Sequence, residues 1–303
     1  MGIESQYSWM DGELVPFADA KIHVLSHTLH YGLGVFEGIR AYKQNGGGGA
    51  IFRLDEHLRR LADSAKMCHM TIPYSVAELR QACIDTLRAN AFEAAYIRPI
   101  VFFGMGAMGL GARTNPVHVT VAVWEWGAYL GKEGLDAGIR VGTSSFTRHH
   151  VNANLQRAKI NGQYVNSVLA RYEANQNGFD EAIMLDPSGY VAEGTGENLF
   201  VIRDGVVKTP PVVNILAGIT RRTAIEILER NQVPVQETVF GRDALYVADE
   251  IFLTGTAAEI TPIREVDHRA VGKPGPLTRL VQETYLDGVR GGVDWMRPYL
   301  TAF

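Results

Sequence analysis

The sequence predicts an α+β protein of two domains. The chain has 303 residues, and at roughly 150 residues per domain this length suggests two domains. Hairpin signals outnumber strand–helix–strand crossovers, as at Asp204-Gly205, which separates two apolar segments over 198–202 and 206–208. This pattern favours mixed or antiparallel sheets with flanking helices over a doubly wound parallel sheet.

Composition excludes several classes of protein. The formal net charge is −4 and no basic block occurs, so nucleic acid is not an expected partner. The longest apolar-rich stretch, 100–112, is too short and too rich in glycine to span a bilayer. Residues 1–11 are polar and lack the apolar core of a secretory signal, so a cytoplasmic location is expected. Two cysteines, Cys68 and Cys83, cannot build a disulfide framework or a four-ligand zinc site.

The first half is expected to mix helices and strands. A helix is predicted over 54–70, because one face carries Leu54, Leu58, Leu61, Ala65 and Cys68. Ser75 and Glu78 form a capping box that begins a second helix. Strands are expected over 36–42, 96–103 and 117–126.

The stretch 127–138 has no clear hydrophobic period and carries internal glycines, so we place the domain boundary there. The expected division is a small domain over 1–128, a linker over 129–137 and a larger domain over 138–303. In the second half, the patterns predict strands over 139–146, 182–185 and 251–253, and helices over 162–177, 219–230, 243–247 and 277–289.

Two apparent motifs are rejected. Gly104, Gly106 and Gly109 spell G-x-G-x-x-G, but a dinucleotide fingerprint needs a helix directly afterwards. The following stretch contains further glycine, asparagine and proline and then a strand, so we interpret it as a loop. The histidines over 23–30 have no carboxylate at ligand spacing, and no metal site is expected.

Four segments together carry the chemistry. Lys159 lies between a loop segment and an apolar helix. The segment 192–200 is a Gly-rich turn with two carboxylates that opens into a strand, and 216–221 is a Gly–Thr helix start that suits a phosphate. The small residues of 254–260 let an anion approach the backbone. A lysine, a glutamate and a phosphate-binding helix start are the parts that a pyridoxal phosphate site needs.

At these residues the chain resembles the branched-chain amino-acid aminotransferases, which are fold-type IV enzymes of the D-amino-acid aminotransferase-like fold. The resemblance runs nearly from end to end. It includes the segments 30–42, 52–61, 95–99 and 126–129 as well as the four segments above. It implies pyridoxal 5′-phosphate as cofactor, amino acids and 2-oxo acids as small-molecule partners, and a homodimer unit with a hexamer as a larger option.

The resemblance also assigns roles to single residues. It implies that Lys159 is catalytic, binds the cofactor covalently and moves the substrate proton, while Glu193 faces the pyridine nitrogen and Tyr164 the ring hydroxyl. It further implies a cofactor-binding set of Arg60, Lys159, Tyr164, Glu193, Gly196, Glu197, Leu216, Gly218, Ile219, Thr220, Gly255 and Thr256.

The implied substrate pocket combines aromatic walls with one arginine. Arg98 is expected to take the distal carboxylate of glutamate or 2-oxoglutarate through a bidentate contact. Tyr31 and the loop near Met108 are expected to come from the neighbouring subunit of a dimer. The full expected set is Tyr31, Phe36, Gly38, Arg40, Tyr96, Arg98, Met108, Trp126, Tyr129, Thr256, Ala257 and Ala258.

The resemblance implies transamination of L-leucine, L-isoleucine and L-valine with 2-oxoglutarate in a ping-pong cycle. Another enzyme of the same fold stays an alternative, namely a D-amino-acid or (R)-amine transaminase or an aminodeoxychorismate lyase. A non-catalytic protein that binds a small molecule is a second alternative, from a different class.

Overall fold

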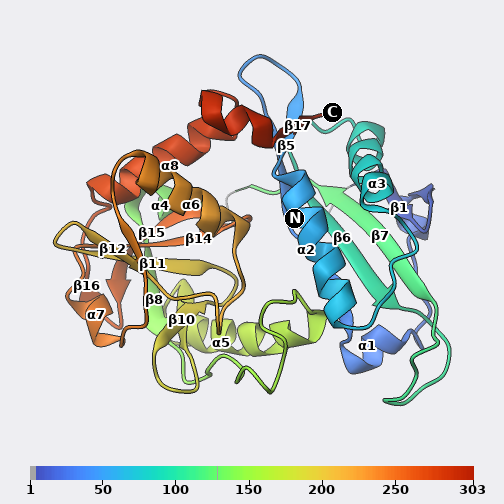
Figure 1. Ribbon diagram of the computed structural model, residues 1–303, viewed down its shortest axis with the longest axis horizontal. Helices are drawn as coiled ribbons and strands as arrows, with labels where there is room; N and C mark the ends of the chain where they lie inside the picture. The colour runs from blue at the N-terminus through green and yellow to red at the C-terminus, as the bar shows by residue number, and fades with distance from the viewer. Residues whose placement is uncertain (1–4, 128) are drawn as a thin grey trace. The chain divides into compact units, whose positions relative to one another are not determined.

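A computed structural model describes residues 5–127 and 129–303. The chain divides into two compact units (Figure 1). Unit 1 contains the residues up to Trp126 together with Ala158–Gln163 and Gly288–Phe303. Unit 2 contains Gly127–Arg157 and Tyr164–Asp287.

The described residues of unit 1 build a sheet of eight strands in which every pairing is antiparallel. Its strands run in the spatial order β17 (Leu300–Ala302), β5 (Gly49–Phe52), β4 (Ile39–Lys43), β6 (Ala95–Phe103), β7 (Val117–Trp124), β1 (Tyr7–Met10) and β2 (Glu13–Pro16), with β3 (Gly34–Phe36) also on β6. Alternate positions of β7 face the core, and Val119, Val121 and Val123 are fully buried.

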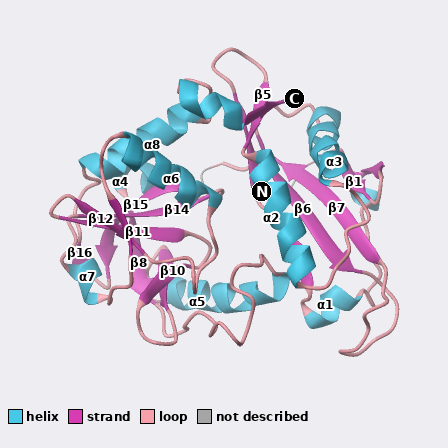
Figure 2. Cartoon of the chain, viewed as in Figure 1, coloured by secondary structure: helices cyan, strands magenta, loops and turns pink. Residues whose placement is uncertain are grey.

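The helices of unit 1 are short apart from two. They are η1 (Phe17–Asp19), α1 (His27–Tyr31), α2 (Leu54–Met67), α3 (Val76–Ala89), η2 (Asn161–Gln163) and η3 (Asp294–Tyr299). The predicted capping box is confirmed: Ser75 Oγ accepts the N–H of Glu78, and the Glu78 carboxylate accepts the N–H of Ser75. Leucines of α2 and α3 pack with the sheet in one apolar core. Figure 2 shows the two helices and the strands of this sheet.

Unit 2 is built on a mixed sheet. Its described strands run in the order β10 (Val191–Gly194), β9 (Glu181–Leu185), β8 (Ile139–Thr143), β15 (Glu259–Val266), β14 (Glu250–Gly255), β11 (Asn198–Arg203), β12 (Val206–Thr209) and β13 (Val235–Glu237), with β16 (Arg269–Ala270) beside β15. The hairpin at Asp204-Gly205 is confirmed, and both residues have positive φ (50° and 74°), as a two-residue hairpin turn requires. The α+β class with antiparallel and mixed sheets is confirmed.

The helices of unit 2 are α4 (Lys132–Ala137), α5 (Tyr164–Gln176), α6 (Ile219–Arg230), α7 (Asp243–Tyr246) and α8 (Pro276–Gly288), whose last residue belongs to unit 1. Among the described residues of both units, no helix is long and apolar enough to cross a membrane.

Several predicted boundaries are wrong. The single strand over 36–42 is two strands, because the chain breaks its pairing at Glu37-Gly38. The helix over 54–70 ends at Met67, and the strand over 139–146 ends at Thr143. Glu193, placed by the sequence in a Gly-rich turn, lies in strand β10.

The division into units differs from the expected domains at two segments of the range 138–303. Ala158–Gln163 belongs to unit 1 because it pairs with β3: Val35 forms an isolated bridge with Ile160. Gly288–Phe303 belongs to unit 1 because β17 completes the sheet beside β5. Ala128, the expected end of the first domain, lies outside the described residues.

Candidate active site

The first turn of α6 presents backbone N–H groups where the sequence predicts a phosphate site. The carbonyl of the N-cap Gly218 accepts the first helical hydrogen bond, from the N–H of Arg222 at 3.0 Å. The N–H groups of Ile219 and Thr220 precede that bond and have no acceptor within the helix. Together with the helix dipole they suit an anion. The predicted helix start is confirmed, and its role in phosphate binding stays a prediction.

Gly218 is required at this position by a close neighbour. A Cβ atom on Gly218 would lie 1.9 Å from Oδ1 of Asn198. The Nδ2 atom of Asn198 donates to the carbonyl of Leu216 at 3.0 Å, just before the helix begins. The asparagine therefore ties the α6 entrance to strand β11.

Asn198 also forms a hydrogen bond with Glu193, which links this carboxylate to the start of α6. The Nδ2 atom of Asn198 donates to Oε2 of Glu193 at 2.9 Å, and Nε of Arg148 lies 3.1 Å from Oε1 of the same carboxylate. The pairing of β10 with β9 shifts register between Val191 and Glu193, a local irregularity that redirects side chains. The Glu193 carboxylate is thus buried, paired with a cation and fixed beside the helix start.

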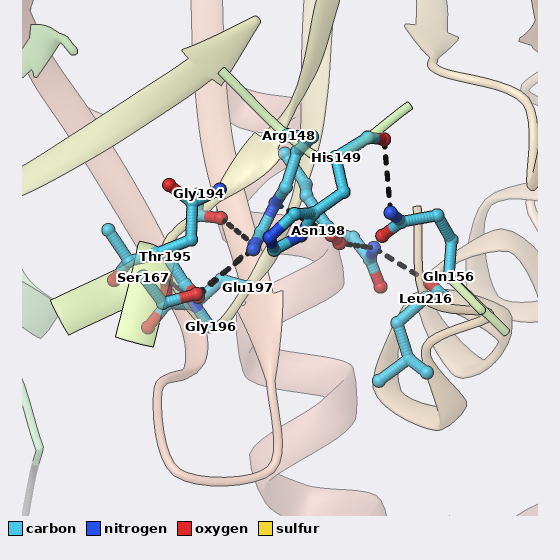
Figure 3. Close-up of polar contacts among 12 residues, drawn as sticks. Arg148, His149, Gln156, Ser167, Gly194, Thr195, Gly196, Glu197, Asn198 and Leu216 are labelled. Carbon is cyan, nitrogen blue, oxygen red and sulfur yellow. Dashed lines mark hydrogen bonds and ion pairs between the residues drawn. The ribbon is translucent and has the colours of Figure 1, made fainter. Parts of the chain in front are cut away.

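Arg148 is held by groups from several segments (Figure 3). Its Nη1 donates to Oγ of Ser167 on α5 at 2.9 Å, and its Nη2 donates to the carbonyls of Gly194 and Thr195 at 2.6 and 3.1 Å. Tyr164, the residue predicted to face the ring hydroxyl, begins the same helix α5, one turn before Ser167. Arg148 therefore connects the helix of Tyr164 to the strand of Glu193.

Glu197 has a different environment from Glu193. Its Oε2 accepts the N–H of Gly196 at 3.0 Å. Burial raises the pKa of Glu197 to about 8, and the charge of nearby Glu181 adds to the shift. At pH 7 Glu197 is therefore mainly protonated. Two glutamates four residues apart thus have different surroundings, since Glu193 is paired with Arg148 and Glu197 lies near another acid.

The end of β14 supplies the small residues predicted to meet an anion. Gly255 is the last residue of β14 and pairs with Glu259 across the turn that contains Thr256, Ala257 and Ala258. The carbonyl of Ala258 accepts the hydroxyl of Thr261 at 2.6 Å, which closes this turn. The same strand register pairs Thr254 with Asn198, so the turn and the α6 entrance belong to one part of unit 2.

Lys159 is fixed in unit 1 by its backbone. Its carbonyl accepts the N–H of Phe36 at 3.1 Å, and its N–H donates to Oγ of Ser64, a fully buried residue of α2, at 3.1 Å. Its Nζ lies 4.8 Å from the centroid of the Phe36 ring. The lysine is thus tied to both β3 and α2, and its amine lies over an aromatic face.

Arg60 lies in unit 1 with Lys159 and makes a charged contact to Glu37. Its Nε and Nη2 donate to the two oxygens of Glu37 at 2.6 and 2.9 Å. Burial alone would raise the pKa of Glu37, but the charge of Arg60 holds it well below the usual range. Burial lowers the pKa of His57, which lies 2.7 Å from the same carboxylate, so that ring is neutral at pH 7.

Arg98 lies among aromatic rings of unit 1. Its guanidinium carbon is 4.8 Å from the Phe36 ring centroid, 5.3 Å from that of Tyr96 and 5.6 Å from that of Trp124. Within the part of the chain that the structure describes, Arg98 forms no ion pair, and its buried Nε has no hydrogen-bond partner. An arginine in this state can receive a carboxylate from a ligand.

The neighbouring predicted residues extend this aromatic cluster. The rings of Tyr96 and Trp126 meet edge to face at 4.6 Å, and Nη2 of Arg40 donates to the carbonyl of Trp126 at 2.9 Å. A Cβ atom on Gly38 would lie 1.9 Å from the hydroxyl of Tyr96, so this position requires glycine. The structure therefore brings these four residues together near Arg98.

Tyr31 and Met108 lie in unit 1, and both are partly exposed. The N–H of Gly109 donates to the hydroxyl of Tyr31 at 3.2 Å, which ties the loop that follows β6 to α1. The described residues between β6 and β7 form no helix, so the interpretation of G-x-G-x-x-G as a loop is confirmed. Tyr129 lies in unit 2, where the guanidinium carbon of Arg171 is 5.7 Å from its ring centroid.

The structure thus gathers the predicted residues in two groups. Unit 1 holds Tyr31, Phe36, Gly38, Arg40, Arg60, Tyr96, Arg98, Met108, Trp126 and Lys159. Unit 2 holds Tyr129, Tyr164, Glu193, Gly196, Glu197, Leu216, Gly218, Ile219, Thr220, Gly255, Thr256, Ala257 and Ala258.

Sequence reasoning missed the residues that hold these groups in place. His57 and Ser64 lie one helical turn on either side of Arg60, and that spacing on α2 could have identified them. Asn198 follows the two predicted carboxylates directly, which is a weaker signal. Nothing in the local pattern distinguishes Arg148 from a surface arginine, because its partners come from distant segments.

The donors present fit pyridoxal phosphate. Unit 1 supplies a primary amine and a guanidinium, from Lys159 and Arg60, and unit 2 supplies a carboxylate and the N–H groups of a helix start. The buried hydroxyl of Thr254, next to Gly255, has no hydrogen-bond partner among the described residues. No group of three His, Cys, Asp or Glu side chains in the described residues could hold a metal ion.

Comparison with known proteins agrees with this chemistry. A branched-chain-amino-acid aminotransferase of Pseudomonas aeruginosa is 55% identical over 285 residues, which cover 93% of this chain and 92% of the relative. The crystal structure of the T.th. branched-chain amino acid aminotransferase with pyridoxamine 5′-phosphate has a TM-score of 0.96 at 46% identity, covering 99% of each chain. The same enzyme with N-(5′-phosphopyridoxyl)-L-glutamate has a TM-score of 0.94 at 44% identity, again over 99% of each chain. Because the family model described as amino-transferase class IV matches residues 34–266, most of the sequence, the chain belongs to that family.

Proposed function

We propose that this chain catalyses the transamination of L-leucine, L-isoleucine and L-valine with 2-oxoglutarate, giving the branched 2-oxo acids and L-glutamate. The Arg98 cluster carries the proposal, because aromatic rings suit an apolar side chain and an arginine without an ion pair in the described chain suits an acidic one. The names of the relatives, at up to 55% identity, support the same substrate class.

The cofactor is pyridoxal 5′-phosphate, as the class IV family and the pyridoxamine 5′-phosphate complex of a relative indicate. When bound, it supplies an aldehyde that links to amines and a ring that withdraws electrons from the substrate Cα. Lys159 is the residue proposed to bind it covalently. Arg60, Ile219, Thr220 and Thr256 are proposed to hold its phosphate, with Gly196, Glu197, Leu216, Gly218 and Gly255 lining the same site.

Glu193 is proposed to face the pyridine nitrogen. A carboxylate there favours the protonated nitrogen, and protonation makes the ring a stronger electron acceptor. The contacts of Arg148 and Asn198 hold both carboxylate oxygens, so the negative charge is kept in one place. Tyr164, at the start of α5, is proposed to donate its hydroxyl proton toward the ring oxygen.

Lys159 is proposed to move the proton of the reaction. Its Nζ takes the proton from Cα of the amino acid, and a neutral amine is needed for that step. The two backbone hydrogen bonds of Lys159 keep the origin of its side chain fixed while the amine moves. Such positioning lowers the entropic cost of proton transfer.

Substrate recognition is proposed to use two anion sites. The α-carboxylate meets Tyr96, Thr256 and Ala257, and the distal carboxylate of 2-oxoglutarate meets Arg98. Phe36, Gly38, Arg40, Trp126, Tyr129 and Ala258 complete the proposed pocket, with Tyr31 and Met108 from a second subunit.

An absorbance titration tests the proposal directly. Purified protein with cofactor is titrated with L-leucine, which should convert the cofactor band to that of the amine form, and then with 2-oxoglutarate, which should restore the first band. D-Leucine is the control and should leave the spectrum unchanged. Conversion by D-leucine alone would contradict the proposal in favour of a D-amino-acid transaminase. Lys159→Ala should bind cofactor without the covalent band.

A homodimer unit is also proposed. One face of α5 exposes the apolar side chains Val165, Val168, Leu169 and Tyr172, while its opposite face packs inward through small residues. An exposed apolar stripe at i, i+3, i+4 and i+7 is typical of a surface that a partner covers. Light scattering after gel filtration should give twice the chain mass for the wild type and a smaller mass for Leu169→Glu. A hexamer would be seen in the same measurement.

A cytoplasmic location remains a proposal of the sequence. Fractionation of cells that express the chain, followed by immunoblotting, would test it.

A further inference from the structure

Glu37 is a fully buried residue whose backbone and carboxylate are both held by hydrogen bonds. It lies between β3 and β4, and its backbone N–H donates to the carbonyl of Pro99 at 2.9 Å. Its Oε1 accepts Nε of Arg60, and its Oε2 accepts Nη2 of Arg60 and lies 2.7 Å from Nδ1 of His57. A buried carboxylate is stable only when paired in this way, so its partners are held as firmly as it is.

His57 donates a hydrogen bond to the Glu37 carboxylate. The ring is buried and neutral, and the ionised Glu37 carboxylate can only accept. The proton of the neutral ring therefore lies on Nδ1, where it points at Oε2 of Glu37. His57 and Arg60 are three residues apart on α2, so both reach Glu37 from the same face of the helix.

The contact with Glu37 determines how the Arg60 guanidinium is oriented. The guanidinium is planar, and Glu37 takes the edge formed by Nε and Nη2. The edge that carries Nη1 is consequently directed away from Glu37. A second anion that binds Arg60 would meet a group whose orientation is already set, which reduces the entropy lost on binding.

We propose that Glu37 and His57 are positioning residues that orient Arg60 toward the phosphate of the cofactor. The inference rests on the proposed function, which assigns that phosphate to Arg60. Neither residue needs to touch the cofactor, because both act through the guanidinium.

The test compares two ligands that differ only in the phosphate. Pyridoxamine 5′-phosphate and pyridoxamine are titrated into cofactor-free protein, and the quenching of protein fluorescence gives a Kd for each. Neither ligand can link covalently to Lys159, so the ratio of the two Kd values reports recognition of the phosphate alone. The ratio of the two Kd values in Arg60→Met is the value expected when the contribution of Arg60 to phosphate binding is lost.

Glu37→Gln and His57→Leu should each lower the preference for the phosphorylated ligand at least about fivefold, with little change in the Kd of pyridoxamine. His57→Asn, whose amide can replace the Nδ1 donor, should recover much of the preference. Asp11→Asn is the matched control, because Asp11 and His118 form another His–carboxylate pair of unit 1, at 2.6 Å. This control should retain the wild-type ratio.

Equal weakening of both ligands in Glu37→Gln and His57→Leu would overturn the inference and leave the proposed function intact. An unchanged ratio in Arg60→Met would overturn both the inference and the assignment of the phosphate to Arg60. Wild-type protein that binds neither ligand would overturn the proposed function itself. If Glu37→Gln does not unfold cooperatively on heating, its Kd values are not used. The ratio of the two Kd values in His57→Leu, compared with that in His57→Asn, then tests the inference.

Discussion

Two buried glutamates, one in each unit, meet opposite electrostatic surroundings. Glu37 in unit 1 is bound on both oxygens by Arg60, and it is ionised. Glu197 in unit 2 is as well buried, but its charged neighbour Glu181 is another acid, and it is mainly protonated at pH 7. Burial is common to both, so the cations within hydrogen-bonding reach decide the charge of each acid.

The charged groups near the proposed cofactor-binding residues also differ between the two units. In unit 1, the guanidinium of Arg60 and the amine of Lys159 both lie close to His57, and such donors suit an anionic cofactor. In unit 2, Arg148 is paired with Glu193, and a second arginine, Arg171, is paired with Glu181. Unit 2 therefore carries two carboxyl groups within a single Gly-rich segment, one paired with an arginine and the other, Glu197, mainly protonated.

The largest effect should follow from removing the cation of the first pair. Arg60→Met leaves Glu37 buried without a counter-charge and should lower the free energy of unfolding of the cofactor-free protein by about 3–5 kcal/mol. Urea denaturation followed by circular dichroism measures it. Arg80→Met, which removes an exposed pair with Asp55, should cost at most about 0.5 kcal/mol. A small effect of Arg60→Met would break the comparison, since Glu37 would then tolerate burial alone.

Glu193→Gln tests the carboxyl group of unit 2 that is paired with Arg148. The half-reaction with L-leucine should slow about 10²–10³-fold, because the amide supplies no charge to stabilise the protonated ring nitrogen. Covalent attachment of the cofactor to Lys159 should persist, and single-turnover absorbance separates the two effects. Glu237→Gln, which alters an ion pair with Arg221 at the edge of the same unit, should react at the wild-type rate.

Arg98→Met should slow the reaction with 2-oxoglutarate more than the reaction with L-leucine. Loss of one charge-assisted contact should lower kcat/KM for 2-oxoglutarate about 10–100-fold, while the half-reaction with L-leucine changes little. Steady-state and single-turnover kinetics measure the two halves, and Arg59→Met, which removes an exposed arginine of α2, is the control for arginine loss in unit 1. A similar loss for both substrates would assign Arg98 to the α-carboxylate instead.

Glu197 of unit 2 is tested through the pH dependence of stability. The pKa of Glu197 rises from its usual 4.5 to about 8 on folding, so the folded state binds more protons between these values. Stability attributable to this group should therefore fall as pH rises from about 4.5 to 8, by at most about 1.4 kcal/mol per pH unit. Glu197→Gln should remove that slope in urea denaturation measured at several pH values. An identical slope in the variant would show that Glu197 is ionised throughout.

Local patterns predicted the elements of the fold and not the pairing of distant segments. The capping box at Ser75, the hairpin at Asp204-Gly205 and the start of α6 follow from neighbouring residues, and each is confirmed. The broken strand at Glu37-Gly38 could not be predicted, because the break depends on how Glu37 pairs with α2. Alternation along a strand carries no information about such partners.

The candidate site shows the same limit. The resemblance named the residues proposed to touch the cofactor, such as Lys159 and Glu193, whose place in long motifs is visible in the sequence. The residues that hold them, Ser64 and Arg148, act through hydrogen bonds to segments far away in the chain. Their function exists only in the folded protein, and a single sequence does not reveal it.

The strands of the two sheets are synthesised in a different order relative to one another. Unit 1 receives β17 from residues 300–302, and β17 pairs with β5, which is made some 250 residues earlier. Unit 2 has its whole sheet, β8–β16, before that strand leaves the ribosome. Unit 2 can therefore fold during synthesis before the sheet that anchors Lys159 receives β17.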